Sequence, residues 1–231
     1  MRLFYDKDIS PNSDIHTLNE VESKHIVRVL RMKCGETIAL LDGKGGYYIC
    51  EIVEGNAKKC GLKILSKEHS EKPLEEIHIA VSPTKQIERI EWFIEKATEI
   101  GITELSLLKC DNSERTKINT ERIKRKVVSA MKQSQRRYLP KINELCDFSN
   151  FIKTHNGGLI ADCFSDKKNA INKVFIQNNC PILIGPEGDF THEELQLALQ
   201  NGYKTITLGP NRLRTETAAL YACMQAKLIV G

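Results

Sequence analysis

The C-terminal part of the chain holds two short apolar runs, Pro181–Ile184 and Thr205–Leu208. Each run is bounded by turn residues and opens directly into a glycine- and proline-rich loop, at 185–188 and 209–211. A helix start follows each loop. Strand, glycine turn and helix in succession is how an α/β domain builds a ligand site at the carboxyl ends of its strands. The pattern therefore predicts such a site here.

From Ile77 onward, apolar strands alternate with amphipathic helices. The pattern predicts strands at 77–82, 104–108 and 158–162, and helices at 84–100, 118–137 and 166–177. In the helix at 84–100 the apolar residues fall on one stripe, and Gly101 closes the helix. Strands that alternate with helices indicate an α/β fold with a mostly parallel sheet covered on both faces.

Residues 1 to about 70 have the pattern of a small β-rich module. Predicted strands at 38–42 and 47–53 flank Asp42-Gly-Lys-Gly-Gly, a strong hairpin signal. A strand follows these glycines, which favours a turn over a phosphate-binding loop. Residues 61–66 form another predicted strand. The polar segment that starts at Ser70 is typical of a linker, so we expect two domains, 1–71 and 72–231.

A short helix is predicted over residues 22–33, with an apolar face formed by Ile26, Val29 and Leu30. Its basic residues fall mostly on another face: Lys24, Arg28 and Arg31. A second basic region, residues 109–141, holds eleven Lys or Arg against three Asp or Glu. Both regions favour a phosphate-bearing partner such as RNA. Solvated helix faces are an equally good interpretation of either region alone.

The composition is that of a soluble globular protein, with 231 residues, 41% hydrophobic residues and a formal net charge of +4. No signal peptide or membrane span is predicted, so we expect a cytoplasmic protein. The eight cysteines are scattered without a C-x-x-C pair. That spacing argues against a zinc site and against a disulfide framework. We therefore expect reduced thiols and no metal.

The two C-terminal loops carry the candidate chemistry. Thr191-His-Glu-Glu is a capping box that starts a helix at Thr191. Thr215 is expected to cap the last helix, and Glu216 suits its first turn, either as a functional acid or as an ordinary helix N-terminal one. Arg212 and Arg214 lie beside them. Carboxylates near arginines and exposed backbone suit a ligand with both charge signs, a description that fits S-adenosylmethionine and other small ligands.

The same loops carry a family resemblance. Ile184-Gly-Pro-Glu-Gly-Asp-Phe-Thr and Leu208-Gly-Pro-Asn-Arg-Leu-Arg-Thr-Glu-Thr-Ala closely resemble the signature of ribosomal RNA small subunit methyltransferase E. Three further segments fit this family in the right order: Lys24–Arg31, Glu95–Ile102 and Gln133–Pro140. The family belongs to the SPOUT class. The resemblance implies a C-terminal domain with a deep trefoil knot, an N-terminal PUA-like β-barrel that binds RNA, and a homodimer.

The activity implied by the resemblance is methylation of uracil N3 at uridine 1498 of 16S ribosomal RNA, with S-adenosylmethionine as donor. The candidate catalytic residues are Arg214, expected to stabilise charge on the uracil oxygens or the target phosphate, and Glu216 or Glu187, either of which is a candidate acceptor of the N3 proton. The implied cofactor-binding residues are Ile184, Gly185, Pro186, Glu187, Gly188, Leu208, Gly209, Leu213, Arg214, Thr215, Thr217 and Ala218. The expected RNA-binding residues are Lys24, His25, Arg28, Arg31, Lys85, Arg122, Arg125, Arg136 and Arg137.

Two positions depart from the family pattern. Asp189 stands where a second glycine is usual, and Asn211-Arg212 stands where Arg-Ile is the commoner pair. Two other functions compete with uracil methylation. One is 2′-O-methylation of ribose, which SPOUT relatives also perform, and the other is a non-catalytic RNA-binding module that has lost its cofactor.

Overall fold

The structure, a computed structural model, describes residues 1–165, 168–175 and 180–231. Its contacts divide the chain into two compact units. The first consists of Met1–Pro73 and Met131–Leu139, and the second of Leu74–Ala130 and Pro140–Gly231. Within the described residues, no helix is long and apolar enough to cross a membrane.

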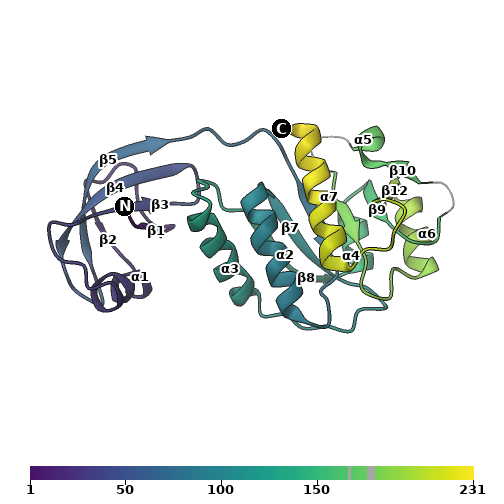
Figure 1. The fold of residues 1–231 in the computed structure, drawn as a ribbon, viewed down its shortest axis with the longest axis horizontal. Coiled ribbons are helices and arrows are strands. Elements are labelled where there is room, and N and C mark those ends of the chain that lie inside the picture. Colours follow the sequence, from purple (N-terminus) through teal and green to yellow (C-terminus); the bar gives the residue numbers. More distant parts are fainter. Residues whose placement is uncertain (166–167, 176–179) are drawn as a thin grey trace. The chain divides into compact units, whose positions relative to one another are not determined.

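The first unit is built on a five-stranded sheet (Figure 1). The strand order is β1 (Leu3–Tyr5), β3 (Thr37–Leu41), β4 (Gly46–Glu54), β5 (Gly61–His69) and β2 (Ile15–Thr17). β1 pairs with β3 in parallel, and the other neighbours are antiparallel. The strands predicted at 38–42, 47–53 and 61–66 are confirmed. The unit's core includes Phe4, Ile38, Leu40, Ile52 and Leu62.

The predicted helix at 22–33 is shorter and differently wound. It consists of α1 (Glu20–Lys24) and a π-helical turn at His25–Val29. Leu30 N donates to His25 O (2.9 Å), so this turn holds one residue more than an α-helical turn. Ile26 stays in the core, but Val29 is 69% exposed. The prediction that Val29 packs inward was wrong because the wider turn rotates it away from the sheet.

The hairpin turn at residues 42–46 receives the segment that returns to the first unit. Gly45 N donates to Arg137 O (3.0 Å), and Leu139 N donates to Gly43 O (2.9 Å). Gly45 has a φ of 106°, a conformation that favours glycine. The glycine cluster is therefore a turn, as predicted, and its backbone binds another part of the same unit.

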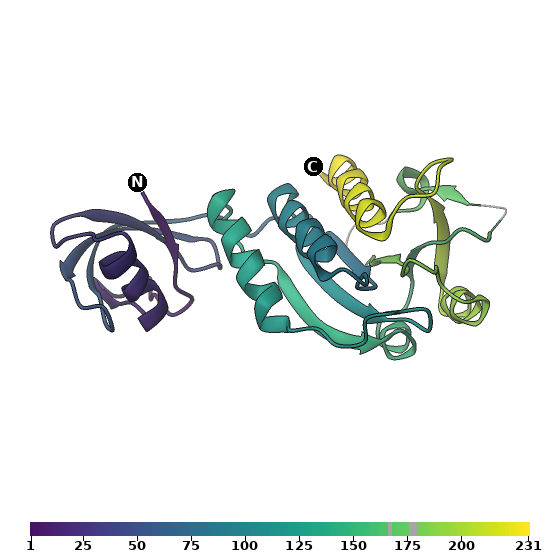
Figure 2. The same ribbon diagram turned by 60° about the horizontal axis from the view of Figure 1, so that its bottom comes forward.

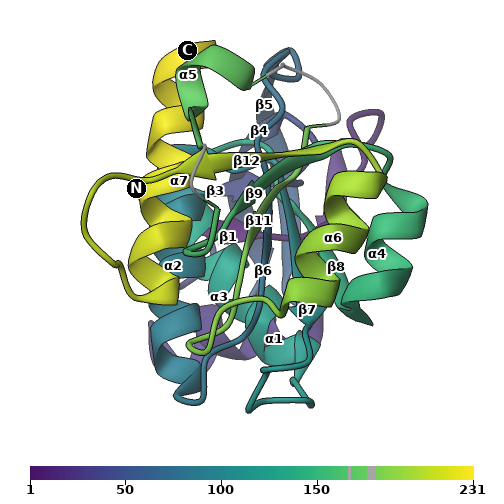
Figure 3. The same cartoon turned by 90° about the vertical axis from the view of Figure 1, so that its right-hand side faces the viewer.

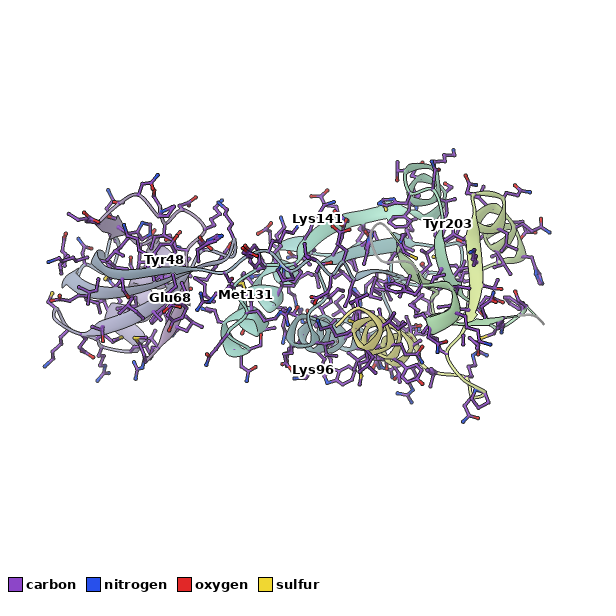
Figure 4. The ribbon with its side chains drawn as sticks, turned by 90° about the horizontal axis from the view of Figure 1, so that it is seen from above. Tyr48, Glu68, Lys96, Met131, Lys141 and Tyr203 are labelled. Atoms are coloured by element: carbon purple, nitrogen blue, oxygen red, sulfur yellow. The ribbon has the colours of Figure 1, made fainter. Side chains whose placement is uncertain are left out.

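Helix α3 (Thr120–Gln133) ends earlier than the predicted residue 137. Gln135, with a φ of 56°, reverses the backbone direction just after the helix. Arg136 and Arg137 therefore lie beyond the helix and not on its basic face, which corrects the prediction. Arg137 instead bonds Glu68 of β5 through its guanidinium (2.6 Å) and lies 5.0 Å from the centre of the Tyr47 ring. Figure 4 labels Glu68 on this sheet, together with Tyr48 of β4.

The second unit contains a seven-stranded sheet in which every neighbouring pair is parallel. The order is β10 (Asn169–Ala170), β12 (Tyr203–Thr207), β9 (Gly158–Ala161), β11 (Ile182–Ile184), β6 (His78–Val81), β7 (Glu104–Lys109) and β8 (Lys141–Asp147). The predicted mostly parallel α/β sheet and its strands β6, β7, β9, β11 and β12 are confirmed. The trefoil knot stays a prediction.

Helices cover both faces of this sheet, as predicted (Figure 3). On one face lie α2 (Ile87–Ile100) and α7 (Thr215–Val230), which pack against each other, and Figure 2 shows α3 in the same row. On the other face lie α4 (Phe148–Thr154) and α6 (His192–Gln200). Gly101, with a φ of 116°, caps α2 as predicted.

Two segments of the second unit differ from expectation. β8 and α4 were not predicted, because β8 is a half-exposed edge strand with no continuous apolar run. The helix predicted at 166–177 is confirmed only in part: residues 169–170 form β10, paired with β12, and α5 (Ile171–Val174) is the helical part among the described residues of this segment. Residues 166–167 and 176–177 of that prediction lie outside the described residues.

Candidate active site

A cavity of about 640 Å³ lies at the carboxyl ends of β9, β11 and β12. The loops after β11 and β12 supply most of its wall, which agrees with the predicted position of a ligand site. The predicted cofactor-binding residues that line it are Ile184, Gly185, Pro186, Glu187, Leu208, Gly209, Leu213, Arg214, Thr215 and Ala218. Gly188 and Thr217 are not among the described lining residues, and neither is Glu216.

Other lining residues were not anticipated from the sequence. Ala161 ends β9, Asp162 and Cys163 follow it, and Arg89 comes from α2. The β9 residues could have been found, because a predicted parallel strand at 158–162 ends at the same edge of the sheet. Arg89 had no comparable signal, since only the packing of α2 against α7 brings it to the cavity.

Arg89 lies between the two carboxylates proposed as proton acceptors. Its guanidinium is 3.6 Å from Glu187 Oε1 and 3.9 Å from Glu216 Oε1. The side chain of Glu187 is 36% exposed, whereas that of Glu216 is 10% exposed. Glu216 Oε2 is buried and has no hydrogen-bond partner among the described residues. The structure thus gives the two acids different settings, Glu187 on the cavity wall and Glu216 behind Arg89.

The start of α7 differs from the predicted cap. Arg214 is the N-cap residue and makes no side-chain capping bond, so the prediction that Thr215 caps the helix was wrong. Thr215 is the first helical residue, and its hydroxyl donates to Gly185 O (3.1 Å). This bond ties the loop after β12 to the loop after β11, and it orients the hydroxyl away from the helix end.

The Asn211-Arg212 departure adds another link between the same loops. Arg212 NH2 donates to Glu187 O (3.2 Å). Arg214 is exposed at the cavity wall. Of the two arginines, Arg212 braces the backbone at Glu187 and Arg214 presents its side chain toward solvent.

Asp189, the other departure, keeps a backbone conformation that suits glycine, with a φ of 65°. Its buried carboxylate accepts from the amides of Cys163 (2.9 Å) and Phe190 (2.8 Å). Burial raises the pKa of the Cys163 thiol, and the nearby Asp189 carboxylate raises it further. Asp189 therefore joins the loop after β9 to the loop after β11, a link that glycine could not make.

Asp162 is the second buried carboxylate at the cavity. Its Oδ1 accepts from the amides of Phe164 (2.8 Å) and Ser165 (2.6 Å), which fix the carboxylate in a local turn. Its Oδ2 is buried and has no hydrogen-bond partner among the described residues. The cavity is thus flanked by negative charge on the β9 side.

The capping box at the start of α6 was predicted correctly. Thr191 Oγ1 accepts from Glu194 N (3.2 Å), and Glu194 accepts from Thr191 N (2.9 Å). Phe190, just ahead of it, is fully buried, and His192 is exposed. Glu194 also accepts from Asp111 N (3.0 Å), so this cap holds the loop after β7 as well.

Many of the predicted RNA-binding residues have acidic partners. The pairs are Lys24–Glu20, His25–Glu22, Lys85–Glu114, Arg122–Glu91 and Arg137–Glu68. Arg28, Arg31 and Arg125 are exposed. Part of the charge of α3 is balanced by α2, because Lys126 also lies 3.7 Å from Glu95. The solvated-face interpretation thus accounts for part of α3.

Comparison with known proteins assigns the chain to a family. A family model for an RNA methyltransferase domain matches residues 70–227, and one for an RNA methyltransferase PUA domain matches residues 18–65. Curated relatives are called ribosomal RNA small subunit methyltransferase E. The protein from Rickettsia conorii is 29% identical over 99% of this chain and 95% of its own length. The protein from Aquifex aeolicus is 28% identical over 95% of this chain and 96% of its own length.

The chain belongs to the ribosomal RNA small subunit methyltransferase E family. Among solved structures, a probable rRNA-methyltransferase from Porphyromonas gingivalis is 37% identical, with a TM-score of 0.87 over 100% of this chain and 98% of its own. A family member from Neisseria gonorrhoeae, solved with S-adenosyl methionine bound, is 22% identical and has the same fold. Its TM-score is 0.86, over 99% of this chain and 98% of its own. The predicted PUA-like N-terminal domain is confirmed by the family match.

Proposed function

We propose that this protein is a 16S ribosomal RNA methyltransferase that methylates uracil N3 at uridine 1498, with S-adenosylmethionine as methyl donor. The observation that carries the proposal is the cavity at the ends of β9, β11 and β12, with Glu187 and Arg214 on its wall. The names of the curated relatives support a small-subunit ribosomal RNA substrate. The base and its position come from the family resemblance.

The donor set of the cavity fits S-adenosylmethionine. A cavity of about 640 Å³ lies in the size range of pockets that bury small organic ligands. Ile184, Leu208 and Leu213 offer apolar surface for the adenine ring, and Asp162 and Glu187 offer negative charge for a ligand with a sulfonium and an ammonium group. When bound, the cofactor supplies an electrophilic methyl group.

We further propose that the loops at 185–188 and 208–215 hold the cofactor largely through backbone groups. The glycines of these loops let the backbone approach a ligand closely. The three links between loops, through Thr215, Arg212 and Asp189, keep these backbone groups in fixed positions. Holding reactants in a productive geometry contributes about 7–11 kcal/mol to rate acceleration.

Glu187 is the proposed acceptor of the N3 proton. Uracil N3–H is a weak acid, so its proton must be taken up as the nitrogen attacks the methyl group. Glu187 lies on the cavity wall with a partly exposed carboxylate, whereas Glu216 is buried behind Arg89. In this assignment Glu216 is a positioning residue that acts through Arg89. Arg214 is proposed to stabilise negative charge on the uracil oxygens or on the target phosphate.

The roles of the two acids are tested by Glu187→Gln and Glu216→Gln. We expect Glu187→Gln to lower kcat by about 10²- to 10⁴-fold, with S-adenosylmethionine affinity changed only a few-fold. Glu216→Gln should have a smaller effect on kcat. Calorimetry with the cofactor and single-turnover methylation of 16S RNA measure both quantities. Near-normal turnover of Glu187→Gln would remove it as the general base.

The substrate is tested by mass spectrometry of 16S RNA from a deletion strain. We expect loss of N3-methyluridine at position 1498 and its restoration by the wild-type gene but not by Glu187→Gln. Loss of a 2′-O-methyl group instead would identify a ribose methyltransferase. No lost modification, combined with no cofactor binding in calorimetry, would identify an RNA-binding module.

We also propose a homodimer formed through α7. Four large apolar side chains on this helix are 41–82% exposed: Tyr221, Met224, Leu228 and Ile229. Exposed apolar residues gathered on one element favour an interaction surface. Light scattering of the full-length protein should give a dimer that Leu228→Glu dissociates. Leu74→Glu, which alters an exposed leucine outside α7, is the matched control.

A further inference from the structure

Three residues with metal-ligating side chains gather at the amino-terminal edge of the second sheet, opposite the cavity. They are His78 at the start of β6, Glu104 at the start of β7 and His155 at the C-terminal end of α4. His78 and Glu104 are register partners on neighbouring parallel strands. One ligand atom from each of the three lies within 4.8 Å of the others.

His155 is oriented as a ligand would be. Its Nδ1 lies 3.1 Å from Phe151 O and 3.0 Å from Thr154 Oγ1. Because a carbonyl oxygen only accepts, Nδ1 carries the ring proton and Nε2 presents a lone pair. The ring also stacks on Phe151, with centroids 4.0 Å apart. Metal-ligating histidines are commonly held in this way, with the other ring nitrogen donating to a backbone carbonyl.

Glu104 and His78 are also held by surrounding polar groups. Glu104 Oε1 accepts from Asn143 Nδ2 (2.6 Å) and Lys141 Nζ (2.8 Å) and lies 3.9 Å from His78 Nε2. Ser106 Oγ is 2.8 Å from His78 Nε2. The side chain of Lys141, labelled in Figure 4, is 66% exposed, so its ammonium can leave without any change in the core.

We propose that His78, Glu104 and His155 bind a divalent transition-metal ion, with Zn²⁺ the best match. Two imidazoles and one carboxylate are a set found in three-ligand zinc sites, in which a fourth position stays open. The nitrogen ligands favour zinc-like ions over Mg²⁺ and Ca²⁺, which prefer oxygen. Tetrahedral ligand atoms lie about 3.3 Å apart, so the three groups must close by up to about 1.5 Å.

A bound ion would join the C-terminal end of α4 to β6 and β7. This edge of the sheet lies away from the proposed methylation site, because the strands are parallel and the cavity is at their carboxyl ends. The ion is therefore a structural group that stabilises the second unit. Because it takes no part in the chemistry, cofactor binding and methylation proceed without it.

The test uses the reduced, metal-stripped full-length protein, titrated with Co²⁺ and then competed with Zn²⁺. We expect one ion per chain, measured by elemental analysis, with visible absorption bands of tetrahedral cobalt. His155→Ala and Glu104→Gln should weaken binding by at least about tenfold. Lys141→Met, which removes the competing ammonium from Glu104, should tighten binding. His69→Ala, at an exposed histidine of the first unit, should leave binding unchanged.

Three results would overturn the proposal. One is an ion stoichiometry well below one per chain. Another is binding that His155→Ala and Glu104→Gln leave unchanged while circular dichroism shows both variants to be folded. The third is a near-ultraviolet thiolate-to-cobalt band, which would assign the ion to cysteines. His155 and Glu104 are partly exposed, so both substitutions are compatible with folding in a way that replacement of buried His78 is not.

Discussion

At the scale of single residues, the site of this RNA methyltransferase is shaped by side chains that fix backbone. Asp189, Thr215 and Arg212 each bond a main-chain group of a neighbouring loop. A hydrogen bond of this kind contributes about 1 kcal/mol net, but its loss in a buried place costs more because the partner is left unpaired. The loops therefore owe their geometry to a few identifiable hydrogen bonds.

Asp189 provides the first prediction. Asp189→Ala should lower the free energy of unfolding by about 2 kcal/mol, since it loses two hydrogen bonds and keeps a strained positive φ. Asp189→Gly should lower the free energy of unfolding by only about 1 kcal/mol, because glycine relieves the strain. Urea denaturation measures the difference. Equal losses in the two variants would show that backbone strain is unimportant here.

Gly45 provides a second prediction about stability. A Cβ at this position would collide with the Tyr138 side chain and the Ser70 carbonyl oxygen, and φ is positive. Gly35 also has a positive φ but has open space around it. Gly45→Ala should cost about 3 kcal/mol and Gly35→Ala about 1 kcal/mol in urea denaturation followed by circular dichroism. If the two losses match, the returning segment is not held at this turn.

At the scale of elements, the helix ends explain how the strands and loops are positioned. The capping box of α6 satisfies its own first turn and holds the loop after β7 through Glu194. Gly101 ends α2 in the left-handed conformation, so the chain turns directly toward β7. Such local signals are complete in the sequence, which is why these boundaries were predicted well.

The capping box yields a third prediction. Thr191→Ala removes the cap and should lower the free energy of unfolding by about 1 kcal/mol, which is seen as a lower melting temperature. Gln196→Ala, at an exposed position of the same helix, should change it little or raise it slightly. Calorimetry of the two variants separates the cap from a general effect of alanine. A neutral Thr191→Ala would mean that Glu194 alone holds the helix start.

Other features could not be predicted because they depend on interactions between distant parts of the chain. Val29 carries an apolar side chain at helical spacing, and only the π-helical turn exposes it. Arg89 is an ordinary helix residue until α2 packs beside α7. Arg137 belongs to a basic run in the sequence, yet it pairs with Glu68. Local pattern predicts most of the described strands and the helix ends at Gly101 and Thr191, whereas these partners come from tertiary packing.

At the scale of the whole molecule, basic charge is distributed over both units but much of it is paired. Lys24, Lys85 and Arg122 have acidic partners, whereas Arg28, Arg31 and Arg125 are exposed. Surface ion pairs are weak and open easily, so paired residues remain available to RNA at some cost. The exposed arginines should contribute most directly to phosphate binding.

The fourth prediction concerns salt. The affinity for a 16S RNA fragment should fall steeply with salt, since binding of basic side chains to phosphates releases counterions. Replacing Arg28 and Arg31 by serine should reduce the slope of log affinity against log salt by about 0.7 for each phosphate that is no longer neutralised. Lys204→Ser, at an exposed residue of β12, should leave the slope unchanged. Filter binding over a salt series measures the slope, and a salt-insensitive affinity would contradict the assignment.

The return of Met131–Leu139 to the first unit also has a consequence for synthesis on the ribosome. Gly43 and Gly45 bond to residues that are made more than sixty residues after the first unit's last strand. At about 5–20 residues per second, this interval lasts from about 3 s to more than 12 s. During translation the first unit therefore remains incomplete until the chain has already entered the second, and a fragment released before residue 139 would leave the glycine hairpin without its partner.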